Sequence, residues 1–395
     1  MRIIICLFLL LMPFTNAFAL NSVLSPSFAV SLLLGAHFFF KRNEIVVSKP
    51  PFLLYLWIIL FFSLLTMSSG EKSLNHFFLW TYPFLIYYFV FKNELNQSFT
   101  LEEIKYEICK IITIITLFSC IFSVFEFVCT NIFSVEMSFI PRGSVEEYTP
   151  FDFGFYRARS FAEESGQFAF FLEIFSPISV YWICKYLTKS YIKISFYIIL
   201  TIGLFTTMSA VGVLSFFIYL FLLYQHYFFY SKSRNANKIV LILFLTVFVT
   251  IILVMIPDLF NFVVDIVKAK MDPDNVSYSD RSSRFEALHS LTGISLLIGY
   301  GPAAFSTLDV ESFISFYLGV LMNTGVLGLL SLLLFLISKY NTLSKIKDDN
   351  LKIAFRCSFL LSCMHLMFID IIYIPWFWVM ISLIDVIRLK ENLNC

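Results

Sequence analysis

Arginines and carboxylates gather in one short segment, at the point where a polar stretch of the chain meets an apolar run. Arg157, Arg159, Glu163 and Glu164 fall within eight residues. Charged groups at the end of a membrane helix cost desolvation free energy unless they pair, face water or hold a ligand. This set could therefore bind an anion or transfer a proton. A structural role fits equally well, in which the glutamates favour a helix N-terminus and the arginines reach toward lipid headgroups.

A second pair of arginines comes later in the chain. Arg281, Arg284 and Leu288 are spaced three and four residues apart, so a helix would present both guanidinium groups on one face, with His289 beside it. Two arginines suit a diphosphate, because each offers a planar fork of donors that stays charged. A basic helix that lies on anionic headgroups is an equally good interpretation.

Other kinds of chemistry are excluded because their patterns are missing. The turn Gly299-x-Gly301 lacks the preceding strand that a dinucleotide-binding fold requires. The chain contains no H-E-x-x-H, G-x-S-x-G or Walker sequence. Its five histidines are scattered, and its eight cysteines show no C-x-x-C spacing. We therefore expect no metal site and no cofactor.

The elements that must position these residues are membrane helices. The chain has 395 residues and is 59% hydrophobic and 14% charged, unlike a soluble domain, and a net charge of +1 gives no general attraction to nucleic acid. A span needs about 20 mainly apolar residues. The sequence predicts an all-α polytopic membrane protein, with a single integral membrane domain over residues 1–395. About twelve transmembrane helices are expected, at 3–20, 23–40, 51–67, 77–91, 111–129, 167–184, 194–208, 211–230, 239–256, 313–337, 357–373 and 376–388.

Two of these predictions have alternatives. The helices at 194–208 and 211–230 meet at Ser209-Ala210-Val211-Gly212 and are expected to form a tight hairpin, one broken helix being the alternative. The first apolar run resembles a signal peptide ending at Ala17-Phe18-Ala19. A second apolar run follows it directly, so we favour an uncleaved first helix.

The distribution of Lys and Arg predicts the orientation in a bacterial inner membrane. Placing the N-terminus in the cytoplasm leaves only eight of the 28 basic residues outside, in agreement with the positive-inside rule. Both termini are then cytoplasmic, and two large loops, about 130–166 and 257–312, face the periplasm. The eight outward residues are Lys72, Arg142, Arg157, Arg159, Lys268, Lys270, Arg281 and Arg284.

Several of these segments resemble one family of membrane enzymes. The stretch from Arg157 to Ala169 resembles the R-x-x-S-F-x-x-E-P-[SA]-x-F-A pattern of bacterial O-antigen and exopolysaccharide repeat-unit polymerases. The matching residues are Arg157, Ser160, Phe161, Glu164, Phe168 and Ala169, whereas Ser165 replaces the usual proline. Arg281 and Arg284, followed by Gly299-Tyr300-Gly301 and Phe305, are similar to the second large loop of that family. Glu311-Ser312 and then Asn323-Thr324-Gly325-Val326-Leu327-Gly328 resemble the helix that comes next.

The resemblance implies a membrane glycosyltransferase. It would move a growing glycan from its undecaprenyl-pyrophosphate carrier onto the sugar of another lipid-linked repeat, at the periplasmic face. Arg157, Arg159, Arg281 and Arg284 would bind the pyrophosphate, and Glu164 or His289 would activate the acceptor hydroxyl. The partners implied are the lipid-linked oligosaccharide and membrane lipid, with a chain-length regulator protein as a candidate and no nucleic acid.

Two alternatives share parts of this pattern. An O-antigen ligase has similar outer loops but carries a histidine where this chain has Glu311-Ser312. A flippase or other transporter of lipid-linked oligosaccharide would hold charges deep within its spans. The interior candidates here are few, namely Glu126, Glu173 and Asp370, so the polymerase remains our first hypothesis.

The predicted topology can be tested with reporter fusions. Fusions at Tyr148 and Ser277 should report the periplasm, and fusions at Ser233 and Lys347 the cytoplasm, because the positive-inside rule sets these sides. A cytoplasmic signal at Ser277 would overturn the orientation and the proposed placement of both large loops.

Overall fold

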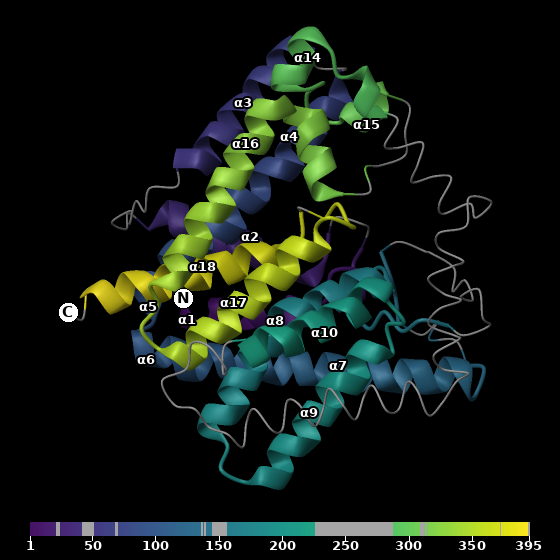
Figure 1. Ribbon diagram of the computed structural model, residues 1–395, viewed down its shortest axis with the longest axis vertical. Coiled ribbons are helices and arrows are strands. Elements are labelled where there is room, and N and C mark those ends of the chain that lie inside the picture. The colour runs from purple at the N-terminus through teal and green to yellow at the C-terminus, as the bar shows by residue number, and fades with distance from the viewer. Residues whose placement is uncertain are drawn as a thin grey trace.

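The protein is described from a computed structural model, which is helical throughout its described part (Figure 1). The structure describes residues 1–20, 24–41, 51–67, 70–135, 137, 140–143, 156–225, 287–308, 313, 315–371 and 373–393. Among these residues there is no strand, and the β-type pairing is limited to an isolated bridge between Ala17 and Arg142. The predicted all-α fold is confirmed.

The helices follow one another along the chain with short connections. Two stretches, η1 and η2, are π-helical and continue neighbouring α-helices, and η4 is a 3₁₀ turn. The elements are α1 (Arg2–Leu11), α2 (Pro26–Phe40), α3 (Pro51–Met67), α4 (Glu71–Tyr82), η1 (Pro83–Val90), α5 (Phe91–Ser98), α6 (Leu101–Glu103), η2 (Ile104–Ile108), α7 (Cys109–Asn131), α8 (Ser165–Tyr186), α9 (Ser190–Phe205), α10 (Ala210–Gln225), η4 (Ala287–Ser290), α14 (Gly293–Ile298), α15 (Ala304–Thr307), α16 (Phe316–Ser344), α17 (Asp349–His365) and α18 (Pro375–Leu393).

Three helical segments are long and apolar enough to cross a bilayer, namely Leu101–Asn131, α8 and α16. They support a membrane protein, but the described helices do not confirm twelve spans, since five further apolar helices have only 10–17 residues. The helix expected at 3–20 ends at Leu11, because Pro13 lacks the N–H that a continuing helix needs. The helix expected at 357–373 instead runs from Asp349 to His365. The one expected at 239–256 lies outside the described residues.

α9 and α10 are two helices that pack on each other, as the hairpin prediction requires. The chain turns over Thr206 to Ser209, where side-chain hydroxyls take part in the hydrogen bonding. The Thr207 hydroxyl donates to the carbonyl oxygen of Leu204 at 2.7 Å and accepts from the Ser209 N–H at 3.2 Å. The Ser209 hydroxyl accepts from the Gly212 N–H at 3.3 Å. These bonds satisfy backbone groups that the two helix ends would otherwise leave without partners.

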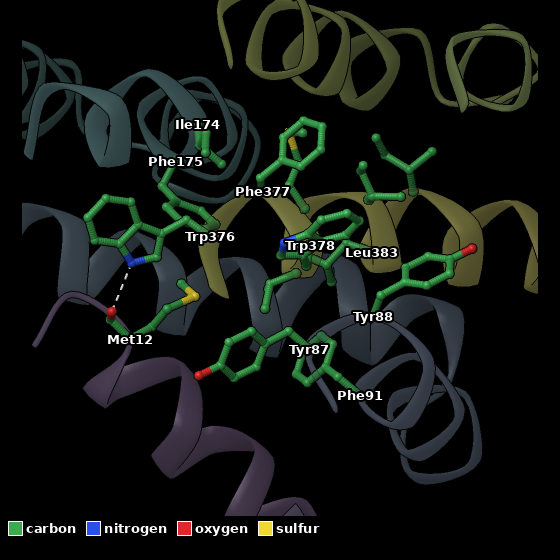
Figure 2. Close-up of a cluster of buried hydrophobic side chains, with 14 of the residues drawn as sticks. Met12, Tyr87, Tyr88, Phe91, Ile174, Phe175, Trp376, Phe377, Trp378 and Leu383 are labelled. Carbon is green, nitrogen blue, oxygen red and sulfur yellow. Dashed lines mark hydrogen bonds between the residues drawn. The ribbon is translucent and has the colours of Figure 1, made fainter. Parts of the chain in front are cut away.

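α8 is the innermost of the three span-length segments. Of its most apolar window, 83% is buried within the protein, against 50% for the segment that contains α7 and 56% for α16. Figure 2 shows Ile174 and Phe175 of α8 beside the aromatic side chains that begin α18. There the indole Nε1 of Trp376 donates to the carbonyl oxygen of Met12 at 2.8 Å. The first and last helical segments therefore share one core with α8.

One end of the bundle joins basic residues from distant parts of the chain. Arg2 pairs with Glu103 at 2.9 Å, and Lys390 donates to the carbonyl oxygen of Asn96 at 2.7 Å. Lys185, at the end of α8, pairs with Asp348 at 3.0 Å. All three basic residues are ones for which the sequence predicts the cytoplasm. Which side of the membrane this end faces stays a prediction.

A buried ion pair joins α16 to α18 near the same end. The ammonium of Lys339 lies 2.7 and 2.9 Å from the two carboxylate oxygens of Asp385. The hydroxyl of Tyr88 accepts from Lys339 at 2.8 Å and donates to Asp385 at 2.7 Å. Lys92 is 3.8 Å from the same carboxylate. Three helical segments thus meet at one network of buried charges.

α16 is broken at Gly325, where another segment crosses it. Gly325 has φ 65 and ψ −169, which lies outside the helical region. A break frees carbonyl groups that lipid cannot satisfy. The N–H of Tyr300 donates to the Met322 carbonyl oxygen at 2.8 Å, and the N–H of Gly301 donates to that of Asn323 at 3.1 Å. The crossing segment therefore supplies the missing donors.

Two glycines allow the backbones to approach at this crossing. A Cβ added at Gly299 would overlap backbone atoms of Asn323 and Thr324, and one added at Gly325 would overlap those of Leu297. Both glycines also have positive φ. The Gly299-x-Gly301 turn and the Gly325 region, separate in the sequence, are thus two sides of one contact.

Replacing either glycine should destabilise the protein. Gly299→Ala and Gly325→Ala each place an L side chain at positive φ, which costs about 1–3 kcal/mol before any backbone displacement. Gly166→Ala is the matched control, because a Cβ at this helical position meets no atom within 4 Å. Thermal unfolding in detergent, followed by size-exclusion chromatography, should show lower midpoints for the first two variants only. Equal midpoints for all three would contradict the close crossing.

Candidate functional site

A buried carboxylate, Glu126 of α7, holds the segment that leads into α8. Its Oε2 accepts the backbone N–H groups of Arg159 at 3.0 Å and Ser160 at 2.6 Å. Its Oε1 lies 3.3 Å from Nη2 of Arg142, and both side chains are almost fully buried. Each charge compensates the other in surroundings where an unpaired ion would be strongly unfavourable.

Arg142 grips the same segment from its other side. It donates to the carbonyl oxygens of Ser160 and Ala162, each at 2.9 Å. Ser160 has φ 51, an unfavourable conformation for an L residue, and its hydroxyl donates to the Ser119 carbonyl oxygen at 3.0 Å. The surrounding bonds therefore fix a strained residue. We call residues 158–162, together with Glu126 and Arg142, the anchored turn.

The chain just before this turn is fixed as well. Asn131, the last residue of α7, accepts the Tyr156 N–H at 2.7 Å and donates to the Tyr156 carbonyl oxygen at 2.9 Å. The N–H of Ala158 donates to the carbonyl oxygen of Thr206, after α9, at 3.0 Å. Arg157 therefore stands between two residues whose backbones are bound to the ends of helices.

The first turn of α8 follows the anchored turn directly. Glu164 is the residue before the helix, is exposed, and makes no capping hydrogen bond with its side chain. Arg159 donates from Nη1 to the carbonyl oxygen of Glu163 at 3.2 Å, and Gln167 donates from Nε2 to the Glu163 carboxylate at 3.3 Å. Gln167 is buried, and its Oε1 receives no hydrogen bond from the described residues.

The loop between α17 and α18 brings two further groups toward the start of α8. The Asp370 carboxylate lies against Gly319 of α16, where an added Cβ would come within 2.6 Å of Oδ2. Burial raises the pKa of Asp370 to about 8. Burial, followed by the negative charges of Glu163, Asp370 and Glu164, raises the pKa of Tyr373. This electrostatic interaction places the loop and the start of α8 near each other.

A second buried pair lies within the helices. His365, at the end of α17, is 2.8 Å from Oε2 of Glu173 in α8, and both side chains are almost completely buried. The ring of Phe170 lies 5.2 Å from the imidazole ring. The pair joins α8 to α17, the helix that leads into the Asp370 loop.

The predicted site residues fall into separate groups. Arg157, Arg159 and Glu164 lie along the anchored turn and the start of α8, whereas Arg281 and Arg284 lie outside the described residues, as do Glu311 and Ser312. Whether these arginines bind a common ligand stays a prediction.

His289 lies on another part of the structure from Glu164. It is exposed on η4, which the hydroxyl of Tyr300 holds by donating to the Ser290 carbonyl oxygen at 2.6 Å. The neighbouring α14 and α15 pack chiefly on α16 and α3. Within the described residues, no contact brings His289 to Glu164, so the two candidates for proton transfer are not interchangeable members of one site.

Sequence reasoning missed several groups that the fold gathers here. Arg142 was counted only as an outward basic residue, and Asp370 only as a candidate for cargo binding in a transporter. Gln167 and Tyr373 were given no role. Glu126 was the strongest available signal, because a carboxylate within an apolar run implies a nearby cation. No fixed spacing could have identified that cation as Arg142.

The chemistry of the site is that of charges and hydrogen-bond acceptors. Among the described residues, no group of three or more His, Cys, Asp and Glu side chains is arranged to hold a metal ion. Arginines on the anchored turn can bind an anion, and the carboxylates at the start of α8 can accept hydroxyl protons. The arrangement thus suits transfer between an anionic carrier and a hydroxyl compound.

The comparisons with known proteins give no family for this chain. A scan against family models finds no match, and neither does a search of curated proteins. The polymerase resemblance therefore rests on short motifs, and function has to be argued from the site.

Removing one member of the anchoring ion pair should destabilise the fold. Glu126→Gln leaves the Arg142 charge buried without a counterion, at a cost of about 3–5 kcal/mol. The double variant Glu126→Gln/Arg142→Met should recover part of that loss, because neither charge remains. The free energy of unfolding in detergent measures both effects.

An exposed carboxylate provides the control for this measurement. Glu102→Gln removes an ion-pair partner of Lys105 whose side chain is 76% exposed, and exposed pairs are worth about 0–1 kcal/mol. Strictly additive losses in the Glu126 and Arg142 variants would show that the two residues do not support each other.

Proposed function

We propose that the protein is an O-antigen repeat-unit polymerase, a glycosyltransferase that joins undecaprenyl-pyrophosphate-linked oligosaccharides at the periplasmic face of the inner membrane. The anchored turn is the observation that carries this proposal. It holds the central residues of the R-x-x-S-F-x-x-E stretch in a fixed geometry. Ser160 is held by Glu126 and Ser119, and the Phe161 ring stacks 4.3 Å from Phe14 and 4.5 Å from Phe122.

A fixed backbone is what electrostatic catalysis of this transfer needs. The reaction breaks the bond between the anomeric carbon and the pyrophosphate oxygen, so negative charge grows on the leaving group. Arg157 and Arg159 sit on a backbone that is already bound at both ends, and little reorganisation is required when charge develops. The protein surroundings strengthen such interactions relative to water.

The contacts of the interior carboxylates favour an enzyme over a transporter. A transporter would use buried charges near the middle of its spans to hold cargo. Glu126 is bound to Arg142 and to the anchored turn, and Glu173 pairs with His365. Both carboxylates therefore have a structural partner. A ligase has no comparable argument against it and remains the second candidate.

The lipopolysaccharide of a deletion strain tests the proposal most directly. Loss of a polymerase leaves one repeat unit on the lipid A core, because ligation and export continue. Loss of a ligase or flippase leaves no repeat unit at all. Electrophoretic banding distinguishes the two outcomes, and a core without any repeat would exclude the polymerase.

Replacing arginine by lysine should reveal a two-pronged phosphate contact. Arg157→Lys keeps the charge but loses the planar fork, and one charge-assisted contact is worth about 1.5–3 kcal/mol, so transfer should slow by roughly 10- to 100-fold. We expect a shortened ladder at unchanged membrane abundance. Arg281→Lys and Arg284→Lys should behave alike.

Three other basic residues supply the controls. Lys72→Ala, at an exposed position of α4, should leave the ladder normal, as should Lys268→Ala and Lys270→Ala. Full-length ladders from all three arginine variants would mean that these residues serve only as headgroup anchors, for which charge alone suffices.

A further inference from the structure

Asp370 occupies a place that α16 leaves open for it. Gly319, in the first part of α16, has no side chain, and an added Cβ would lie 2.6 Å from Oδ2 of Asp370 and 3.2 Å from its carboxyl carbon. The residue is half-buried, and the structure gives its carboxylate no hydrogen bond or ion pair with a described residue. A carboxylate placed in this way can change its protonation state without breaking a structural contact.

The groups that surround Asp370 are mostly acidic. Tyr373 shares its loop, and Glu163 and Glu164 lie at the start of α8, near enough for all three carboxylates to raise the pKa of Tyr373. α16 contributes the uncharged Gly319, and α17 ends at His365, whose imidazole is already paired with Glu173. A pyrophosphate would be repelled by three carboxylates, whereas a neutral sugar would not.

An independent observation at Gln167 points to a ligand with hydroxyl groups. Gln167 is only 4% exposed, and its amide nitrogen lies 3.3 Å from the Glu163 carboxylate, so the amide group stands at this acidic cluster. Its Oε1 is buried and receives no hydrogen bond from the described residues. Buried acceptors are normally satisfied, and a hydroxyl of a bound molecule would supply the donor.

We propose that Glu163, Gln167, Asp370 and Tyr373 form the subsite for the acceptor sugar, and that Asp370 is the catalytic residue that takes the proton from its attacking hydroxyl. This inference rests on the proposed polymerase function and divides the site into two sides. The arginines of the anchored turn hold the pyrophosphate of the donor. The acidic side holds the acceptor.

The transfer step balances with these groups. An oxygen of the Asp370 carboxylate takes the hydroxyl proton, and the hydroxyl oxygen forms the new bond to the anomeric carbon. The bond from that carbon to the carrier pyrophosphate breaks, and its electron pair leaves on the pyrophosphate. Asp370 then releases the proton to water.

Asp370 fits this role better than the two residues expected from the sequence. Glu164 is exposed, and His289 lies on η4, packed with other helices. A general base works best with a pKa near the pH of reaction. Burial raises the pKa of Asp370 to about 8, so its ionised fraction grows steeply between pH 7 and pH 9.

The test uses the full-length protein reconstituted with a purified lipid-linked repeat unit. Asp370→Asn should lower kcat by about 100-fold or more with a much smaller change in acceptor KM, as expected for loss of a general base. The wild-type rate should rise from pH 7 to pH 9, and that rise should be absent in the Asn variant. Asp349→Asn, exposed at the start of α17, should match the wild type.

Gly319→Ala provides a second variant that keeps every charge. The added methyl group displaces the Asp370 carboxyl, so kcat should fall and the midpoint of the pH profile should move. Unchanged kcat and midpoint in this variant, or an Asp370→Asn enzyme with the wild-type rate and pH rise, would overturn the inference. Failure of the wild-type protein to form any polymer would instead contradict the proposed function itself.

Discussion

The ion pair between Glu126 and Arg142 is the interaction on which the rest of the site depends. Neither residue could be buried alone, because a single desolvated charge costs several kcal/mol. Together they use their remaining donors and acceptors on the backbone of residues 159–162. An irregular segment thereby becomes as well determined as a helix. The position of α8, which begins three residues later, follows from it.

A low-dielectric environment imposes the same rule elsewhere in the molecule. Backbone groups that leave a helix within the membrane need partners from the protein itself. At Gly325 these partners are N–H groups of Tyr300 and Gly301, and at the end of α9 they include the hydroxyls of Thr207 and Ser209. Irregular backbone occurs in both places because the protein satisfies it.

Apolar runs predicted where helices lie better than where they end. The run 3–20 is continuous in hydropathy, yet α1 stops at Leu11, because Pro13 interrupts the hydrogen-bond ladder and hydropathy does not register it. α17 begins eight residues before its expected start. Asp348 caps it by accepting the Leu351 N–H at 3.2 Å, and its polar first turns lie outside any apolar run.

The site was predictable only where its members are neighbours in sequence. Arg157, Arg159 and Glu164 stand on one short segment, and their spacing alone singles them out. Arg142 joins them across a loop of no fixed length, and Asp370 arrives from the far end of the chain through the packing of α17 on α8. Such pairings depend on the path of the chain between helices, which no local pattern encodes.

The network around Lys339 has a consequence for how the protein is made. Lysine near the centre of an isolated helix opposes transfer into lipid by about 2.5–3.5 kcal/mol, and Asp385, its counterion, is 46 residues further along the chain. During synthesis, α16 emerges well before α18 and carries its charge without that partner. The translocon would have to retain α16 until the last helix appears. The C-terminal helices should then enter the bilayer as one unit, and ribosomal release of the final segment becomes the event that completes membrane integration.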